Sequence, residues 1–333
     1  MIRRPSGQTS FFEDTVYESA FRNVDHWLLD LGKAIDFEQF RPIVEEPYST
    51  TGGRPTDPLM LFKIVFLQFV GELYDRKVQE AVQFNLLYKW FAGLAVDAAA
   101  PDYSTISKFR TRLGADRFQR IFNLVVDQAR SAGVITDRLR LVDATDVRAR
   151  VDLFGPHQRK KNKDSGGGGK GPKLPNGPDP DAAFGAKSSK KKFYRYKTHI
   201  GFDRDSGLIT DLRVTPGNYD DGSEFPYLIC EHPPWAVTAD KGYDYRNNHN
   251  HCHKLKIEDG IIRKRTQDQP DEAIRRQRPR VERHFAEMKA QHGLGQARFW
   301  GLAKMRIQGL MTGLVVNCKR LKALRRQPVL AAT

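Results

Sequence analysis

Three acidic residues, all beyond residue 140, have the type and setting of metal ligands. Asp143 interrupts the apolar run at residues 139–145, and Asp240 directly follows the apolar run at residues 235–239. A carboxylate in such a run either faces an open edge or carries a desolvation penalty. Glu282 lies in a later segment with helical spacing. Carboxylates gathered at one point repel one another unless a cation neutralises them, and Mg²⁺ favours oxygen ligands of this kind.

Two such ions, bound by these acids, would indicate a phosphoryl-transfer reaction. Two divalent ions about 3.5–4 Å apart activate an attacking oxygen and stabilise the leaving oxygen in an in-line displacement at phosphorus. Structural roles stay open at this point, because an aspartate at a strand end is often a helix cap or a turn former. Asp146 is a rival for Asp143, since the spacing of the two aspartates does not decide between them.

Basic residues accompany Glu282 at helical spacing. Successive separations of 3, 4, 3 and 4 residues place five side chains along one helical face: Arg275, Arg278, Glu282, Phe285 and Lys289. Arg makes bidentate contacts to phosphate and Lys acts as a point charge, so the three basic residues are candidate DNA contacts. The same spacing also fits an ordinary ladder of salt bridges.

These acids must be positioned by a sheet that follows a helical region. Residues 1–135 show helical signals, including a strongly apolar helix after Pro58, a residue that suits the first turn of a helix. From residue 139 onwards the order is strand, strand, strand, helix, strand, helix, strand, helix. This order indicates an α/β fold, a mixed sheet with helices packed on it. We therefore expect an all-α N-terminal region at 1–135 and an α/β domain at 136–333.

Two further segments are candidates for nucleic-acid contact. Residues 155–192 are rich in Gly, Pro and Lys and are expected to form a flexible basic loop. The loop ends in a cluster that could track a DNA backbone or be only a solvated charge run: Lys190, Lys191 and Lys192. Residues 101–132 resemble a helix-turn-helix in outline, although a plain helical packing unit is the alternative. Its candidate phosphate contacts are Lys108, Arg110 and Arg112.

The overall charge indicates a polyanionic partner. The chain has 55 Lys and Arg against 40 Asp and Glu, a formal net charge of +15, which favours nucleic acid first and an anionic membrane surface second. Its 3 cysteines are widely spaced and odd in number, which argues against a disulfide framework. The longest apolar stretch, around residues 59–70, is too short and too polar to span a bilayer. We expect a soluble intracellular protein.

With these motifs in place, the chain resembles the DDE transposases of bacterial insertion sequences. Four stretches carry the resemblance, which extends over roughly residues 50–325: Gly53–Pro58 with the helices up to Arg110, Val142–Thr145, Tyr196–Ile200 through Val237–Tyr243, and Arg278-x-x-x-Glu282-x6-Lys289. The family often has a Tyr three residues before the Arg of the last motif, whereas this chain has Arg275.

The resemblance implies a ribonuclease-H-like catalytic core in which Asp143, Asp240 and Glu282 bind a divalent metal, Mg²⁺ or Mn²⁺. Arg278 and Lys289 would bind DNA near the cut. Members of the family hydrolyse the phosphodiester at element ends and use the freed 3′-hydroxyl to attack target DNA. The expected partner is double-stranded DNA, both terminal inverted repeats and target. A homodimer on DNA and a cytoplasmic, nucleoid-associated location in bacteria are also implied.

Two other functions stay open on the sequence. One is a DNA-binding protein of transposase origin that no longer cuts, against which the intact set of three acids argues. The other is a metal-dependent nuclease without strand transfer. A joining assay with a pre-cut DNA end separates this nuclease from a transposase, because the nuclease would give no joined product.

Overall fold

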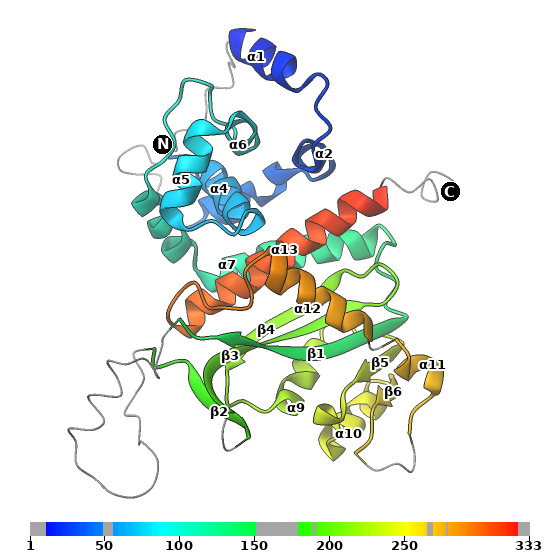
Figure 1. Cartoon of the computed structure of the whole chain (residues 1–333). Coiled ribbons are helices and arrows are strands. Elements are labelled where there is room, and N and C mark those ends of the chain that lie inside the picture. The colour runs from blue at the N-terminus through cyan, green and yellow to red at the C-terminus, as the bar shows by residue number, and fades with distance from the viewer. Residues whose placement is uncertain are drawn as a thin grey trace, which may run out of the picture.

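The structure combines a group of N-terminal helices with a six-stranded mixed sheet (Figure 1). It is a computed structural model that describes residues 11–48, 56–150, 179–188, 191–264, 269–277 and 279–325. The N-terminal elements are α1 Phe11–Phe21, α2 Trp27–Ala34, η1 Phe37–Phe40, α3 Arg41–Glu45, α4 Pro58–Val70, α5 Asp75–Phe84, α6 Leu86–Ala92 and α7 Tyr103–Ser131. The expected helical region is therefore observed.

Local signals explain where the N-terminal helices begin and bend. Asp57 caps α4 by accepting a hydrogen bond from the Leu59 amide at 2.9 Å, and the apolar helix that follows is buried on most faces. Asn85 caps α6 by accepting hydrogen bonds from the Leu87 and Tyr88 amides, which separates α6 from α5. α7 bends at Gly114, whose backbone is not helical (φ 72°, ψ 159°).

The sheet has the strand arrangement of a ribonuclease-H-like fold, which confirms the expected fold class. Its strands are β1 Leu139–Arg148, β2 Ala183–Ser188, β3 Lys191–Asp203, β4 Ile209–Pro216, β5 Ala236–Ala239 and β6 Glu258–Ile261. β1, β3 and β4 are antiparallel neighbours, whereas β5 pairs parallel to β1 and β6 parallel to β5. β2 was not expected: residues 183–188 of the predicted loop pair with the start of β3. The rest of that loop, residues 155–178 and 189–190, lies outside the described residues.

Helices cover both faces of the sheet, as Figure 1 shows. One face carries α9 Asp221–Glu224, η2 Phe225–Leu228, η3 Lys241–Tyr243 and α10 Arg246–Lys254. The other faces α7, α12 Pro279–Gln291 and α13 Leu302–Arg325, with the short α11 Glu272–Arg275 preceding α12. Side chains alternate along β1: Leu141 belongs to the core beneath α12 and α13, whereas Val142 belongs to the core beside α9 and α10.

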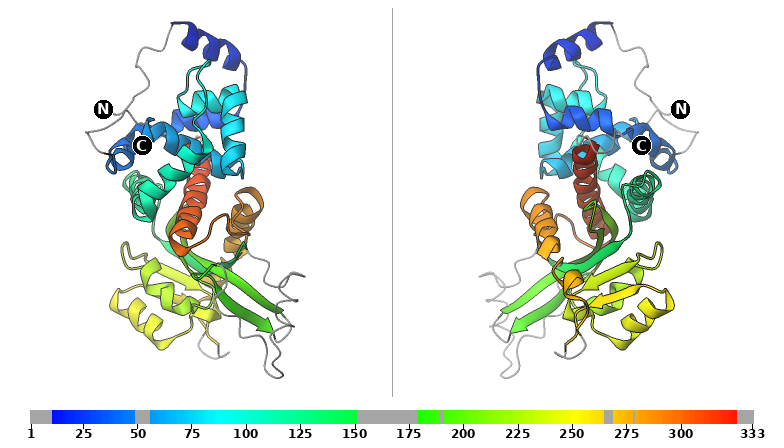
Figure 2. Two further views of the ribbon diagram at one scale, coloured as in Figure 1. Left: turned by 90° about the vertical axis from the view of Figure 1, so that its left-hand side faces the viewer. Right: turned by 90° about the vertical axis from the view of Figure 1, so that its right-hand side faces the viewer.

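Helix α13 joins the N-terminal helices to the sheet. It packs against α7, α2 and α4 and also against β4, and Figure 2 shows it running from the sheet into the helical region. One continuous apolar core therefore includes Phe66 of α4, Leu314 of α13 and Ile200 of β3. The division at residues 135 and 136 stays a prediction. Among the described helices, α13 included, none is long and apolar enough to cross a membrane.

Arg110 is a structural residue, which corrects its expected role as a phosphate contact. Its side chain is buried, donates to Gln68 Oε1 at 2.9 Å and forms an ion pair with Asp75 at 2.6 Å. Its guanidinium also stacks on the Phe299 ring, 4.9 Å from the centroid. A buried cation needs such partners because desolvation is costly. Lys108 and Arg112, in contrast, are exposed on α7.

If α13 couples the helices to the sheet, Leu314→Ala should destabilise both together. Loss of this buried side chain should lower the free energy of unfolding by about 2–5 kcal/mol. Urea unfolding would be followed by circular dichroism and by Trp fluorescence in a Trp235→Phe/Trp300→Phe background, where the remaining Trp residues are in the helical region. Coincident transitions are expected. Separate transitions would show two independently folding units.

Arg110→Ala should lower the stability of the protein, whereas Lys108→Ala should weaken its DNA binding. Removing Arg110 leaves buried polar groups unpaired and should lower the free energy of unfolding by about 2–3 kcal/mol. Lys108→Ala should leave stability within about 0.5 kcal/mol but lower the salt slope of DNA binding by about 1. Denaturation midpoints and binding titrations at several salt concentrations measure both effects. A stable Arg110→Ala protein with weakened DNA binding would contradict the structural role.

Candidate active site

Asp143 lies on β1, beside Asp240, which directly follows the neighbouring parallel strand β5. Val142 of β1 is opposite Ala239 of β5, so the two aspartates are the next positions along these strands. Adjacent strands are about 4.8 Å apart. Val142 and Ala239 both enter the core beside α9 and α10. Because successive side chains alternate, Asp143 and Asp240 face the opposite side, toward α12.

The end of β5 explains the local geometry of both aspartates. β5 stops at Ala239, so the β1 backbone beyond Val142 is not paired with it. The Ala144 amide instead donates to Asp143 Oδ1 at 2.8 Å. The Lys241 amide donates to Asp240 Oδ1 at 2.6 Å, and Asp240 thereby caps η3. Both aspartates are half-buried at an open edge, so each combines a local structural role with a position suited to binding a cation.

Asp146, the rival of Asp143, points to the other face of β1. It is three positions along the strand, which reverses the direction of the side chain. There it forms an ion pair with Arg195 of β3. Asp143 is thus the aspartate of this pair that lies beside Asp240.

Glu282 is exposed in the first turn of α12, on the side of the sheet that Asp143 and Asp240 face. Val281 and Met288 of the same helix enter the core beneath it, and α12 packs on β1. Within the described ranges, no three His, Cys, Asp or Glu side chains are close enough together to form a metal site. Glu282 is therefore on the expected face but is not assembled with the two aspartates.

The expected single helix around Glu282 is wrong. The structure has two helices, α11 ending at Arg275 and α12 beginning at Pro279. Proline disfavours helical conformation in the residue before it, which explains the break. Arg275 therefore does not share a continuous face with Glu282 and Lys289, and Phe285 is buried in the core. Arg278 lies outside the described residues.

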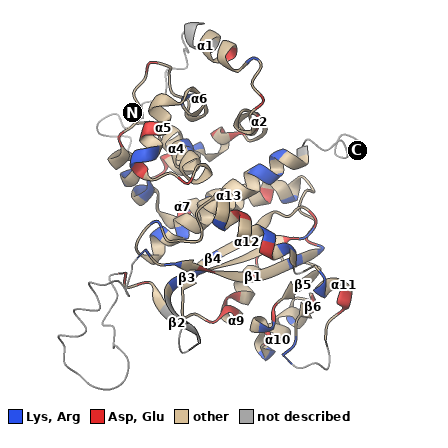
Figure 3. Ribbon diagram, viewed as in Figure 1, with Lys and Arg blue, Asp and Glu red and all other residues tan. Residues whose placement is uncertain are grey.

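Tyr243 of η3 is buried close to the two aspartates and to α9. Tyr243 is 1% exposed and packs against Phe225, with ring centroids 5.9 Å apart. Burial raises the pKa of Tyr243 well above its usual value, and four carboxylates raise it further: Asp143, Asp221, Asp240 and Asp220. Figure 3 shows the acidic residues of α9 on the face of the sheet away from α13. Carboxylates on both faces of the sheet therefore contribute to the negative potential around Asp143 and Asp240.

Sequence reasoning missed the contribution of α9. Asp221 pairs with Lys197 of β3 at 2.8 Å, and its Oδ1 lies 3.9 Å from the Nδ1 atom of the buried His199. Burial lowers the pKa of His199 to about 4, so this imidazole is neutral near neutral pH. Adjacent aspartates after a strand were the available signal, but the sequence does not show that α9 packs against the segment after Asp240.

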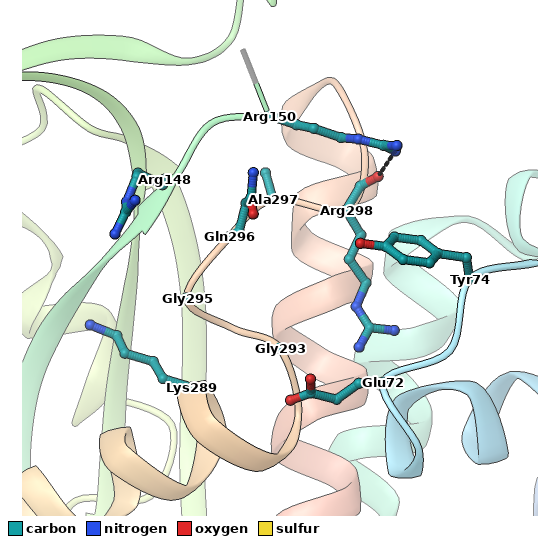
Figure 4. Close-up of a pocket in the computed structure, with 10 residues that line it drawn as sticks. All are labelled: Glu72, Tyr74, Arg148, Arg150, Lys289, Gly293, Gly295, Gln296, Ala297 and Arg298. Carbon is teal, nitrogen blue, oxygen red and sulfur yellow. Dashed lines mark hydrogen bonds between the residues drawn. The ribbon is translucent and has the colours of Figure 1, made fainter. Parts of the chain in front are cut away.

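A basic pocket lies further along the same two elements. It has a volume of about 380 Å³ and includes Arg148 from the end of β1 and Lys289 from the end of α12 (Figure 4). Tyr74, Arg150 and Arg298 also line it, and Arg150 donates to the Arg298 carbonyl at 3.1 Å. Glu72 also lines the pocket, but its four cationic residues outnumber this one acid, and cationic side chains around a cavity of this size can bind phosphate groups.

The other expected DNA contacts are only partly described. Lys108 and Arg112 are exposed on α7, and the Arg112 guanidinium stacks on the Tyr48 ring at 4.8 Å. Lys191 and Lys192 begin β3, but their side chains lie outside the described part of the structure, as does all of Lys190.

Asp143 and Asp240 fit a divalent cation by their donor chemistry. Both offer carboxylate oxygens, the ligands that Mg²⁺ and Mn²⁺ favour. Their setting supports this fit, because the buried Tyr243 hydroxyl beside them makes no hydrogen bond to any described residue. The edge is therefore polar and negatively charged.

Two models of protein families match the chain. A family model described as a transposase domain (DUF772) matches residues 16–112, and a second, described as a transposase DDE domain, matches residues 135–318. Two solved structures are similar at low TM-scores. A piggyBac transposase synaptic complex with hairpin DNA has 10% identity, covers 92% of this chain and 78% of its own, and scores 0.38. A Mos1 transposase paired-end complex with the left transposon end has 9% identity, covers 81% and 80%, and scores 0.22.

The DDE model matches more than half of the 333 residues, including both aspartates and the helix that carries Glu282. Members of this family cleave DNA and transfer strands, and they generally use divalent metal. The protein belongs to the DDE transposase family.

Proposed function

We propose that Asp143, Asp240 and Glu282 are the catalytic residues with which this transposase cuts and joins DNA. The observation that carries the proposal is the parallel register of β1 and β5, which puts Asp143 beside Asp240 on one face. Helix α12, with Glu282 in its first turn, packs on β1 on that same face. Because Glu282 is not assembled with the aspartates, we propose that its final approach accompanies DNA binding.

The proposed metal is Mg²⁺, with Mn²⁺ as a substitute. When bound, such ions lower the charge on the reacting phosphate and assist the attacking and leaving oxygens. In hydrolysis, water oxygen forms a bond to phosphorus, and the bond to the 3′-oxygen breaks to give a 3′-hydroxyl. In strand transfer, this hydroxyl oxygen attacks a target phosphate and the target 3′-oxygen leaves. Asp143 and Asp240 orient the reacting centre from rigid strand positions, which limits its movement between the two steps.

The basic pocket extends the proposed DNA path beyond the acids. Arg148 is five residues after Asp143 on β1, and Lys289 is two helical turns after Glu282 on α12. The two elements that carry the carboxylates therefore also carry the cations. We propose that phosphates flanking the cut occupy this pocket, with Arg278 and Lys289 as nearby contacts and with Lys108 and Arg112 contacting DNA further along.

We also propose that the protein acts as a homodimer on DNA, because transposition needs two element ends in one complex. Sedimentation of the protein with and without duplex DNA that contains element ends would measure this. Two protein copies per DNA complex are expected. A complex with one copy that still joins DNA would contradict the proposal.

Asp143→Asn should abolish strand cleavage while Asp146→Asn leaves it intact. Both changes remove one charge from β1, but only Asp143 lies beside Asp240, whereas Asp146 pairs with Arg195. Outer-shell changes at metal sites cost about 10–100-fold, so loss of a direct ligand should cost more than about 100-fold. Cleavage would be measured with Mg²⁺ on a labelled DNA pool that includes sequences flanking the protein's own gene. Binding to the same DNA should be retained in both variants.

The same assay separates the proposed function from its rivals. Wild-type protein that binds DNA without metal-dependent nicking would support a DNA-binding protein. Nicking without joining of a pre-cut end would support a simple nuclease. Equal cleavage by both aspartate variants would overturn the site assignment.

A further inference from the structure

The short helix α9 is fixed rigidly to the segment that carries Asp240. The Asn248 side chain donates to the Gly222 carbonyl of α9 and to the Tyr243 carbonyl, both at 3.0 Å. The Tyr245 hydroxyl donates to Asp220 at 2.9 Å. A Cβ atom at Gly222 would lie 2.4 Å from the Tyr245 ring, so only glycine permits this close approach. The position of Asp221 relative to Asp240 is therefore fixed by the fold.

Asp221 is oriented by two residues of β3. Lys197 forms an ion pair with it at 2.8 Å and also donates to the Tyr219 carbonyl at 2.7 Å. His199 approaches from the core side, with 3.9 Å between its Nδ1 and the Asp221 carboxylate. His199 Nε2 is already hydrogen-bonded to Thr215 at 2.9 Å. β3 pairs with β1 at this level, with Ile200 opposite Asp143, so Asp221 lies at the same end of the sheet as the catalytic aspartates.

Two buried polar atoms beside Asp221 lack hydrogen bonds to the described residues. They are the hydroxyl of Tyr243, which is 1% exposed, and Nδ1 of His199, which is fully buried. Buried polar groups nearly always have a partner, so each such atom requires an explanation. Tyr243 lies close to Asp143, Asp221 and Asp240, and the His199 Nδ1 atom lies 3.9 Å from the Asp221 carboxylate. A bound cation with its ordered water would supply the missing partners.

We propose that Asp221 is a further positioning residue of the active site, which binds a water of the divalent metal from the α9 side, opposite Glu282. The proposal rests on the proposed function of Asp143 and Asp240. A water-mediated contact fits the geometry, because the described carboxylates do not form a set of three direct ligands. Mg²⁺ usually keeps several of its waters, so a carboxylate that does not contact the ion directly can still bind one of those waters and orient the ion.

A purely structural role for Asp221 makes a different prediction. As an acid in the first turn of α9 and the ion-pair partner of Lys197, it could serve only to fix α9. Loss of either partner would then have the same effect. A positioning role instead requires that Asp221→Asn weakens metal binding while Lys197→Met, which removes the ion pair and the hydrogen bond to the Tyr219 carbonyl, does not.

The test measures Mn²⁺ binding to the full chain with duplex DNA by electron paramagnetic resonance. Asp221→Asn should weaken Mn²⁺ binding by about 10–100-fold and raise the Mg²⁺ concentration for half-maximal cleavage by a similar factor. Glu258→Gln is the matched control, because Glu258 is exposed and pairs opposite Ala236, at the far end of β5 from Asp240. Melting temperatures would verify that each variant is folded. Unchanged Mn²⁺ binding in Asp221→Asn would overturn the proposal, as would equal weakening in Lys197→Met.

Asp143→Asn distinguishes failure of this inference from failure of the proposed function. If Asp143→Asn weakens Mn²⁺ binding and Asp221→Asn does not, only the role of Asp221 is wrong. If neither variant changes Mn²⁺ binding, the metal site itself is wrong and the role of Asp221 falls with it.

Discussion

The repulsion between two carboxylates at one sheet edge is the constraint on which the rest of the structure depends. Unit charges about 5 Å apart repel by on the order of 3 kcal/mol at an effective dielectric of 20. The fold imposes this cost, because the register of β1 and β5 puts Asp143 beside Asp240. Each aspartate offsets part of it by accepting a backbone amide. A divalent cation would remove the remainder, so the geometry favours metal binding before any DNA arrives.

The elements on the two faces of the sheet differ in how firmly they hold the acids near Asp143 and Asp240. On one face, Asn248 and Tyr245 fix α9 against the segment after Asp240. On the other, α12 is anchored by Val281 and Met288, yet Glu282 at its first turn remains exposed. Helix α13 joins this sheet to the N-terminal helices in one core. In the proposed function, the two aspartates are already adjacent, and the site is completed only when Glu282 approaches them on DNA binding.

The sequence was sufficient to predict a mixed sheet with flanking helices, although not β2, and to single out Asp143 and Asp240, because an Asp within or directly after an apolar run is a local signal. The break before α12 was not predicted: the spacing of the basic residues indicated one helix, although Pro279 is a local signal for the boundary. The sequence could not show that Arg110 is buried, since its partners Gln68 and Asp75 are distant in the chain. The role of α9 depends on long-range packing against Tyr243, which no local pattern reveals.

The most direct measurement is to map the metal with Fe²⁺, which substitutes for Mg²⁺ and, with peroxide and ascorbate, generates hydroxyl radicals that cut the nearby polypeptide. Mass spectrometry would locate the cuts. The account predicts cuts around Asp143 and Asp240 in the free protein and an additional cut around Glu282 once DNA is bound. Cuts confined to another acidic region, such as the Asp244 and Asp259 carboxylates that flank His249, would contradict it.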